Sequence, residues 1–411
     1  MEKGIAFEKE SQIAKESRST LEIIARQGAQ RMLQAAIEEE VNDYIDSHSH
    51  LTDGNRQMVV RNGWMPERDL QSGLGTIDLQ QPRVRDRRKG HRFTSRILPR
   101  YMRRFPSIEA LIPVLYLKGV STNDFSEALE AILGENAAGL SASTIVRLKK
   151  SWEDEYEEWH KRDLSDKRYV YFWVDAVYFG VRLAEDRPCM LVIMGTLEDG
   201  TKELVAIHDG ERESTLSWKG VLQDLKRRGL KNVPELSVGD GALGYWAALA
   251  EEFPGTREQR CWVHKTANIL DKLPKKVQPE AKKLIHELYM AETKKDALES
   301  YDMFLGRYGA KYPRACECLE KDKEVLFTFY DFPAEHWVHI RTTNPIESTF
   351  ATVRHRQRQT KGCGSRQATL AMVYKLGREA EKHWHKIKGW VLIPKVIAGV
   401  KFVDGVEEQA A

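Results

Sequence analysis

The pattern of hydrophobic and polar positions changes several times along the 411-residue chain and divides it into regions of different secondary structure. Residues 1–60 carry apolar side chains at helical spacing, which predicts one or two helices. Residues 62–82 are rich in glycine and alternate apolar with polar positions, which is typical of short strands or a hairpin. Helical spacing returns from 108 to about 162, with breaks at 119–124 and 134–139 that separate three predicted helices.

The last of these helices has the features of a helix that reads DNA. It starts in a segment rich in Ser and Thr, Leu140–Thr144, and its polar positions include Ser143, Arg147 and Lys150, which we expect to contact DNA. A helix, a short turn and a second helix of this kind form a helix-turn-helix. An ordinary helical bundle gives the same pattern, so both interpretations stay open.

Residues 168–263 consist mainly of apolar runs of strand length. The predicted strands are 169–179, 189–194, 204–208, 234–240 and 259–263, with one helix between the third and fourth strands and another, 241–253, between the fourth and fifth. This order, β, β, β, α, β, α, β, is that of ribonuclease-H-like folds, so an α/β catalytic domain is expected. Topology alone does not decide function.

The pattern as a whole predicts a mainly helical DNA-binding region followed by a catalytic domain with an all-helical insertion. The expected parts are an N-terminal helical region (1–60), a strand and basic linker region (61–106), a helix-turn-helix region (107–163), the first part of a ribonuclease-H-like catalytic core (164–265), a helical insertion (266–335), the final helices of the core (336–395) and a C-terminal tail (396–411).

Composition narrows the class of protein. Hydrophobic residues make up 41% of the chain and charged residues 30%, which is the balance of a soluble globular protein. No apolar run approaches the roughly 20 residues that span a bilayer, and no secretory signal is visible, so we expect no membrane partner. The five cysteines form no disulfide framework, and a reducing cytoplasmic location is therefore expected: Cys189, Cys261, Cys316, Cys318 and Cys363.

Charge is distributed unevenly although the net charge is only +3. Between Arg83 and Arg104 ten Arg and Lys residues face a single acid, Asp86, and residues 348–366 contain five Arg and Lys residues and no acid. Such blocks indicate two places where a polyanion backbone is held, although a solvated charged surface is the simpler alternative. The candidate DNA contacts are Arg83, Arg85, Arg87, Arg88 and Lys89 in the first block and Arg354, Arg358 and Lys361 in the second.

Three carboxylates stand out by their positions. Asp175 lies inside an otherwise apolar strand, where a charge is costly unless it has a partner such as a metal ion. Asp240 ends a strand and precedes Gly241, where the backbone could approach a ligand closely. Glu347 lies in Asn344–Glu347, which reads as an N-cap, a proline in the first turn and a capping glutamate. Each acid also has a purely structural explanation as a buried hydrogen-bonding group or a helix cap.

The three acids together suggest a metal site. The strands that carry the two aspartates are neighbours in the expected topology, and a later helix could bring Glu347 against them. Clustered carboxylates repel one another and need cations, and ligation by oxygen alone favours Mg²⁺ or Mn²⁺. Two such ions about 3.5–4 Å apart can activate an attacking oxygen and stabilise a leaving oxygen in phosphodiester chemistry.

Several motifs resemble those of the Mutator-like bacterial insertion-sequence transposases, which use a D-D-E catalytic triad. They cover most of the chain and comprise Tyr116–Thr122, Leu140–Thr144, Asp175–Tyr178, Gln259–His264, Glu335–Trp337 and Arg341–Glu347. The resemblance implies that Asp175, Asp240 and Glu347 are the metal-binding catalytic triad. It also implies a Cys-x-x-His element, here Cys261 and His264, and an N-terminal region that binds terminal inverted repeats.

Three further residues are expected near the active site. We interpret His264 as a phosphate contact or proton shuttle and Cys261 as a buried strand residue, because a structural zinc site would need two more ligands. Trp337 could stack on an unpaired base beside the cleavage point, and an ordinary core tryptophan is the alternative.

The resemblance implies a homodimeric transposase that cleaves the inverted repeats of its own element and joins them to target DNA, with no small-molecule substrate. A homodimer is expected because two element ends are handled together. Two alternatives stay open: a nuclease that hydrolyses DNA without joining it, and a DNA-binding repressor without catalysis.

Overall fold

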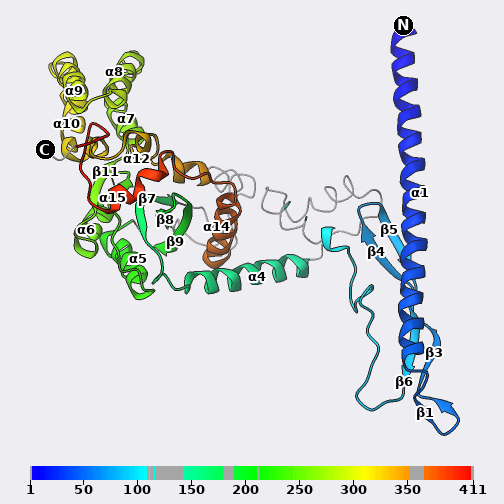
Figure 1. Cartoon of the computed structure of the whole chain (residues 1–411). Coiled ribbons are helices and arrows are strands. Elements are labelled where there is room, and N and C mark those ends of the chain that lie inside the picture. The colour runs from blue at the N-terminus through cyan, green and yellow to red at the C-terminus, as the bar shows by residue number, and fades with distance from the viewer. Residues whose placement is uncertain are drawn as a thin grey trace. The chain divides into compact units, whose positions relative to one another are not determined.

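The computed structural model describes residues 2–108, 111, 115, 142–178, 189–210, 213–241, 243–350 and 365–408. These residues form two compact units, Met1–Val146 and Arg147–Ala411 (Figure 1). None of the described helices combines the length and apolar character that crossing a membrane requires.

The N-terminal unit is built on one long helix, α1 (Glu2–Ser47), rather than two. Its strands are β1 (Thr52–Asp53), β2 (Arg56–Gln57), β3 (Val59–Trp64), β4 (Arg68–Ser72), β5 (Gly75–Leu79) and β6 (Pro82–Asp86). They pair antiparallel as β1–β2, β3–β6 and the hairpin β4–β5. Ile37 of α1 packs with Leu70, Ile77, Leu79 and Leu98 in a small buried core, because the helix places one apolar face on this hairpin. The predicted strand region is therefore confirmed.

Most of the predicted helix-turn-helix lies outside the described residues and stays a prediction. Of that region the structure describes chiefly α4 (Ala142–His160). From residue 147 this helix belongs to the second unit, where Trp152, Tyr156 and Trp159 are buried. The Tyr156 hydroxyl donates to the carbonyl of Ile207 at 2.9 Å, so the last two-thirds of α4 serve to pack against the sheet.

The second unit contains a five-stranded mixed sheet with the order β11-β10-β7-β8-β9. Its strands and first helices are β7 (Tyr169–Tyr178), β8 (Cys189–Leu197), β9 (Lys202–Gly210), α5 (Thr215–Arg227), β10 (Leu236–Gly239), α6 (Leu243–Glu252) and β11 (Arg257–Arg260). The strands β7, β8 and β9 pair antiparallel, whereas β10 is parallel to both β7 and β11. The predicted order β, β, β, α, β, α, β is confirmed.

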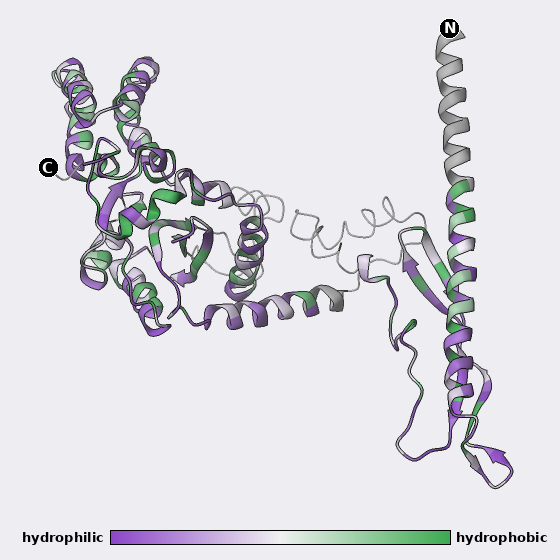
Figure 2. Cartoon of the chain, in the orientation of Figure 1, coloured by the Kyte–Doolittle hydropathy of each residue, from purple (hydrophilic) through white to green (hydrophobic). Residues whose placement is uncertain are grey.

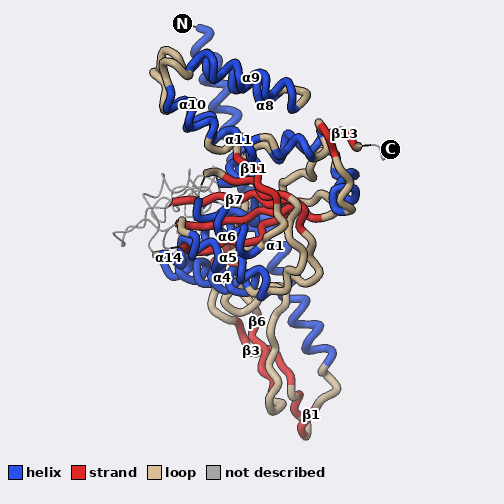
Figure 3. The backbone as a smooth tube through the Cα atoms, turned by 90° about the vertical axis from the view of Figure 1, so that its left-hand side faces the viewer, coloured by secondary structure: helices blue, strands red, loops and turns tan. Residues whose placement is uncertain are grey.

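Helices cover both faces of this sheet. On one face α5 and α6 lie across the strands, and residues such as Phe172, Trp218 and Leu249 form the main core (Figure 3). On the other face Tyr171 and Trp173 contact the segment 336–339, and α14 (Arg366–Glu381) packs on β9. The central strands are correspondingly among the most hydrophobic segments of the unit (Figure 2).

Helices follow the sheet, and residues 266–335 contain no strand, as predicted. They are α7 (Trp262–Leu270), α8 (Gln278–Met290), α9 (Lys294–Tyr308), α10 (Pro313–Glu320), α11 (Lys323–Leu326) and the short 3₁₀ turns η1 (Thr328–Asp331) and η2 (Ala334–His336). The chain continues through α12 (Trp337–Ile340), a helical stretch at 344–350, α14, η3 (Trp390–Leu392), α15 (Ile393–Ile397) and the hairpin β12 (Phe402–Val403) and β13 (Val406–Glu407).

The fifth strand is shorter than predicted. The sequence pattern predicts a strand that extends to Val263, but β11 ends at Arg260 and α7 begins at Trp262. Two long-range bonds explain the difference: the Cys261 amide donates to the carbonyl of Gly239 at 2.8 Å, and the Trp262 amide to the carbonyl of Arg341 at 3.1 Å. Cys261 is thus the buried N-cap residue of α7, and its prediction as a strand residue is wrong.

Candidate active site

The register of two adjacent parallel strands relates the positions of the two aspartates. In the ladder between β7 and β10, Trp173 pairs with Val238, an offset of 65 residues. The same offset separates Asp175 from Asp240, which directly follows β10. Adjacent strands lie about 4.8 Å apart and paired residues point to the same face, so the register, continued by two residues, would bring the two aspartates together.

Their common face is the one covered by the segment that leads to Glu347. Trp173 points to the same side as Asp175, two residues further along β7, and its indole N–H donates to the carbonyl of His339 at 2.9 Å. On the opposite face, a Cβ at Gly239 would lie 2.9 Å from Val174 and 3.0 Å from Trp246 of α6. The close packing there leaves the aspartates on the face toward residues 339–347.

Glu347 is connected to the end of β10 by a short chain of hydrogen bonds. The carbonyl of Gly239 accepts from the amide of Cys261, and the Cys261 sulfur accepts from the amide of Thr343 at 3.3 Å. The Thr343 hydroxyl in turn lies 2.5 Å from the Glu347 carboxylate. Gly239 and Glu347, which are 108 positions apart in the sequence, are therefore linked through three consecutive contacts.

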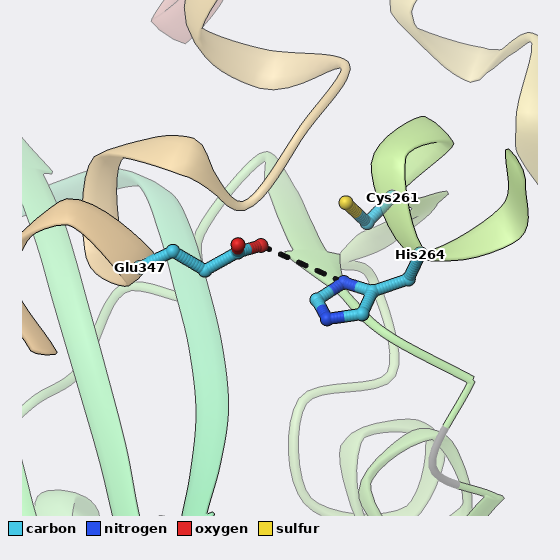
Figure 4. A group of neighbouring side chains, drawn as sticks. All are labelled: Cys261, His264 and Glu347. Atoms are coloured by element: carbon cyan, nitrogen blue, oxygen red, sulfur yellow. Dashed lines mark ion pairs between the residues drawn. The ribbon is translucent and has the colours of Figure 1, made fainter. Parts of the chain in front are cut away.

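Cys261, His264 and Glu347 converge from two helices (Figure 4). His264 Nδ1 lies 3.6 Å from Glu347 Oε1, and one ligand atom from each of the three side chains lies within 4.8 Å of the others. The Cys-x-x-His spacing positions this pair because Cys261 precedes the first turn of α7 and His264 lies within it.

The electrostatics of this cluster favour a positively charged His264 beside the negative charges of Cys261 and Glu347. A hydrogen bond with Cys261 and the charges of Cys261, Glu347 and Asp240 raise the pKa of His264 to about 9, although burial opposes the shift. Burial raises the pKa of the Cys261 thiol, but hydrogen bonds from His264 and Thr343 outweigh it and the net pKa is lowered. Because His264 responds to both Glu347 and Asp240, the two acids belong to one electrostatic neighbourhood.

Glu213 is a fourth acid at this site, and no sequence pattern singles it out. It lies just before the N-cap of α5, and its carboxylate accepts a hydrogen bond from Tyr178 at 3.4 Å. Burial, followed by the charges of Asp240 and Asp175, raises the pKa of Glu213 to about 7. Hydrophobic periodicity could not identify Glu213, because this residue lies in the segment between β9 and α5. Its environment is formed by residues of β7 and α5, and Tyr178 of β7 comes close to it only in the folded protein.

The donor set fits a hard divalent cation. Asp175, Asp240 and Glu347 offer only carboxylate oxygens, and the negative charge of the two aspartates is large enough to shift the pKa of Glu213. A cation would offset this repulsion, and oxygen donors suit Mg²⁺ or Mn²⁺ better than soft metals. The triad residues remain predicted ligands.

Two details near the acids differ from the sequence prediction. The space that a Cβ at Gly241 would take is filled by the Arg260 guanidinium, so this glycine accommodates a side chain of the protein and not an approaching ligand. The helix that contains Glu347 starts at Asn344, one residue earlier than predicted. The carbonyl of Thr343 accepts from the Glu347 amide at 3.0 Å.

Trp337 is held within an aromatic cluster. Its ring lies 5.4 Å from Phe329 and 4.8 Å from Tyr330, both in edge-on geometry, and its indole N–H donates to the carbonyl of Phe332 at 2.8 Å. These contacts account for Trp337 as a packing residue, and stacking on a base stays a prediction.

The first basic block presents a row of cations. Arg83 and Arg85 are exposed on one face of β6, and Arg87 and Lys89 are exposed in the segment with a bend and a turn that follows the strand. Arg88 instead bonds to Asp86 at 2.7 Å and to the Tyr44 hydroxyl at 2.9 Å, and these bonds hold the pKa of Asp86 well below its usual range. Arg88 therefore has a structural role within the unit.

The other predicted DNA contacts are only partly described. Arg147 is exposed on α4, whereas Lys150 forms an ion pair with Asp154 at 3.0 Å. The side chain of Ser143 and the residues Arg354, Arg358 and Lys361 lie outside the described part of the chain.

Comparisons with known proteins identify the family. A family model described as "Transposase, Mutator family" matches residues 3–387. The transposase for insertion sequence element IS6120 of Mycolicibacterium smegmatis is 52% identical over 295 residues, which cover 72% of this chain and 91% of the relative. The transposase for insertion sequence element IST2 of Acidithiobacillus ferrooxidans is 49% identical over 288 residues, covering 68% and 95%.

Among solved structures, a chain of the Drosophila P element transposase strand transfer complex aligns with 75% of this chain and 86% of its own length, at 10% identity and a TM-score of 0.30. The sequence matches extend over both units of the protein. The resemblance drawn from its motifs is confirmed, and the chain belongs to the Mutator family of transposases.

Proposed function

We propose that this transposase cleaves the terminal inverted repeats of its own insertion sequence and joins them to target DNA, using Asp175, Asp240 and Glu347 as a D-D-E triad. The expected convergence of these acids carries the proposal. Continued beyond its last pair, Trp173 with Val238, the register of β7 and β10 would set Asp175 opposite Asp240, and the Gly239–Cys261–Thr343 bonds link the end of β10 to the segment that carries Glu347. The strand order and directions of the sheet support a ribonuclease-H-like catalytic core.

The triad would hold two Mg²⁺ or Mn²⁺ ions, which when bound polarise phosphodiester oxygens. Asp175 and Asp240 hold their carboxylates on one face of the sheet, where the ions would bind between adjacent strands. Glu347 reaches this face from the following helix, with its carboxylate hydrogen-bonded by Thr343. His264, protonated at neutral pH because its pKa is raised to about 9, supplies a positive charge beside Glu347 for a DNA phosphate.

The N-terminal unit would bind the repeats through the row Arg83, Arg85, Arg87 and Lys89, whose exposure and spacing suit a phosphate backbone. A homodimer would hold two element ends together. The exposed apolar side chains of α1, including Leu21, Ile24 and Met32, offer a surface that a second copy could cover. A protein with this activity would act on the nucleoid in the bacterial cytoplasm.

A strand-transfer assay on repeat-bearing DNA tests the proposal. Wild-type protein with Mg²⁺ should give cleaved ends and joined products, and Asp175→Asn, Asp240→Asn and Glu347→Gln should each give neither while still binding the repeats. Nicking without joining would favour a nuclease. Transposition that persists in all three variants would leave the triad without a role and favour a DNA-binding protein of another kind.

A further inference from the structure

The Thr343 hydroxyl lies at the centre of the Cys261–His264–Glu347 cluster. Its oxygen is 2.5 Å from Glu347 Oε1, 3.1 Å from Cys261 Sγ and 3.3 Å from His264 Nδ1, and Thr343 is fully buried. An ion bound by these three ligand atoms would need the space that this hydroxyl fills. The cluster is therefore organised around a hydroxyl and not around an additional metal ion.

The Thr343 hydroxyl is the donor in its hydrogen bond with the Glu347 carboxylate. A hydroxyl has one proton, and the nearby carboxylate is the shortest and most strongly charged acceptor, so the proton points to Glu347. Cys261 Sγ and His264 Nδ1 then lie on the acceptor side of the Thr343 oxygen, at 3.1 and 3.3 Å. The amide of Thr343 donates to Cys261 Sγ at 3.3 Å, which fixes the backbone that carries the hydroxyl.

We propose that Thr343 is a positioning residue that holds the Glu347 carboxylate toward the metal site, with Cys261 as its anchor. This inference rests on the proposed function, because it assumes that Glu347 binds a metal ion. It also explains the Cys-x-x-His element, since Cys261 connects the end of β10 to the segment before Glu347, and His264 closes the network from α7. Partners that orient a metal ligand in this way contribute about 10–100-fold to metal affinity.

Mn²⁺ binding by the full-length protein, measured by electron paramagnetic resonance, tests the proposal. Thr343→Val keeps the shape of the side chain and removes the hydroxyl, and it should weaken Mn²⁺ binding about tenfold. Thr343→Ser restores the hydroxyl and should stay within about twofold of wild type. Thr349→Val is the matched control, since Thr349 is also buried but its hydroxyl bonds to the carbonyl of Pro345 at 3.4 Å.

The Mg²⁺ concentration that gives half-maximal cleavage of element-end DNA should also rise in Thr343→Val. It should stay unchanged in Thr343→Ser and in Thr349→Val. Equal Mn²⁺ affinity in Thr343→Val and wild type, with binding lost in Glu347→Gln, would overturn the positioning role and leave the proposed function intact. Unchanged binding in Glu347→Gln would overturn both. If Thr343→Val does not fold, Cys261→Ala removes the anchor instead: several-fold weaker binding is expected, and unchanged binding overturns the proposal.

Discussion

Replacement of Glu213 by Gln should stabilise the metal-free protein above neutral pH. Burial and the charges of Asp240 and Asp175 raise the pKa of Glu213 from 4.5 to about 7. The folded protein therefore holds this proton more tightly than the unfolded chain, and the free energy of unfolding falls as the pH rises from about 4.5 to 7. This pKa shift corresponds to a loss of at most about 3 kcal/mol in the free energy of unfolding. Solvent screening of this partly exposed group reduces the loss to about 1–2 kcal/mol at pH 8.

Urea denaturation at pH 5 and pH 8, with and without Mg²⁺, measures this effect. Glu213→Gln should be more stable than wild type at pH 8 without Mg²⁺, and the gain should shrink at pH 5 and in the Asp240→Asn background. Glu258→Gln is the matched control, because burial alone raises the pKa of Glu258 and Mg²⁺ should not alter its effect. A Glu213→Gln variant with unchanged stability at pH 8, or with a gain independent of Asp240, would refute the idea that these acids repel one another.

Other consequences of the structure can be tested with single substitutions. Gly239→Ala should lower the free energy of unfolding by about 1–3 kcal/mol in thermal denaturation, because the new methyl overlaps Val174, whereas Gly220→Ala in α5 has open space and should raise it by up to about 1 kcal/mol. Arg87→Ala should weaken repeat binding and lower its salt dependence by about one ion without changing stability; equal effects on binding and stability would contradict its exposed position. Arg88→Ala should instead destabilise the N-terminal unit, as measured by urea denaturation, and this loss should begin to diminish as the pH falls below 3.8, the ordinary pKa of the Asp86 carboxyl, because the unfolded chain then takes up the proton.

Much of the sheet could be predicted because its strands have a strong local signal. The run Tyr169–Tyr178 is apolar on both faces, as a strand covered by helices on each side must be, and its predicted boundaries agree with the structure within one residue. The end of β11 could not be predicted, because Trp262 and Val263 favour a strand locally but long-range bonds to Gly239 and Arg341 start a helix there.

The sequence singles out candidate site residues only where a residue breaks its local pattern. Asp175 stands out as a charge within an apolar strand, and the offset of 65 residues to Asp240 equals the strand register. Glu213 and Thr343 occupy ordinary positions in connecting segments, and their environment comes from residues far away in the sequence. Such residues can be recognised only after the strands and helices have been placed.

The most direct test of the converging triad is the anomalous scattering of Mn²⁺ in crystals of the protein bound to element-end DNA. We predict manganese between the carboxylates of Asp175 and Asp240, with Glu347 ligating one of the ions and the scissile phosphate beside them. Manganese bound elsewhere, with either aspartate or Glu347 away from the ions and the DNA strand, would contradict the convergence of the triad.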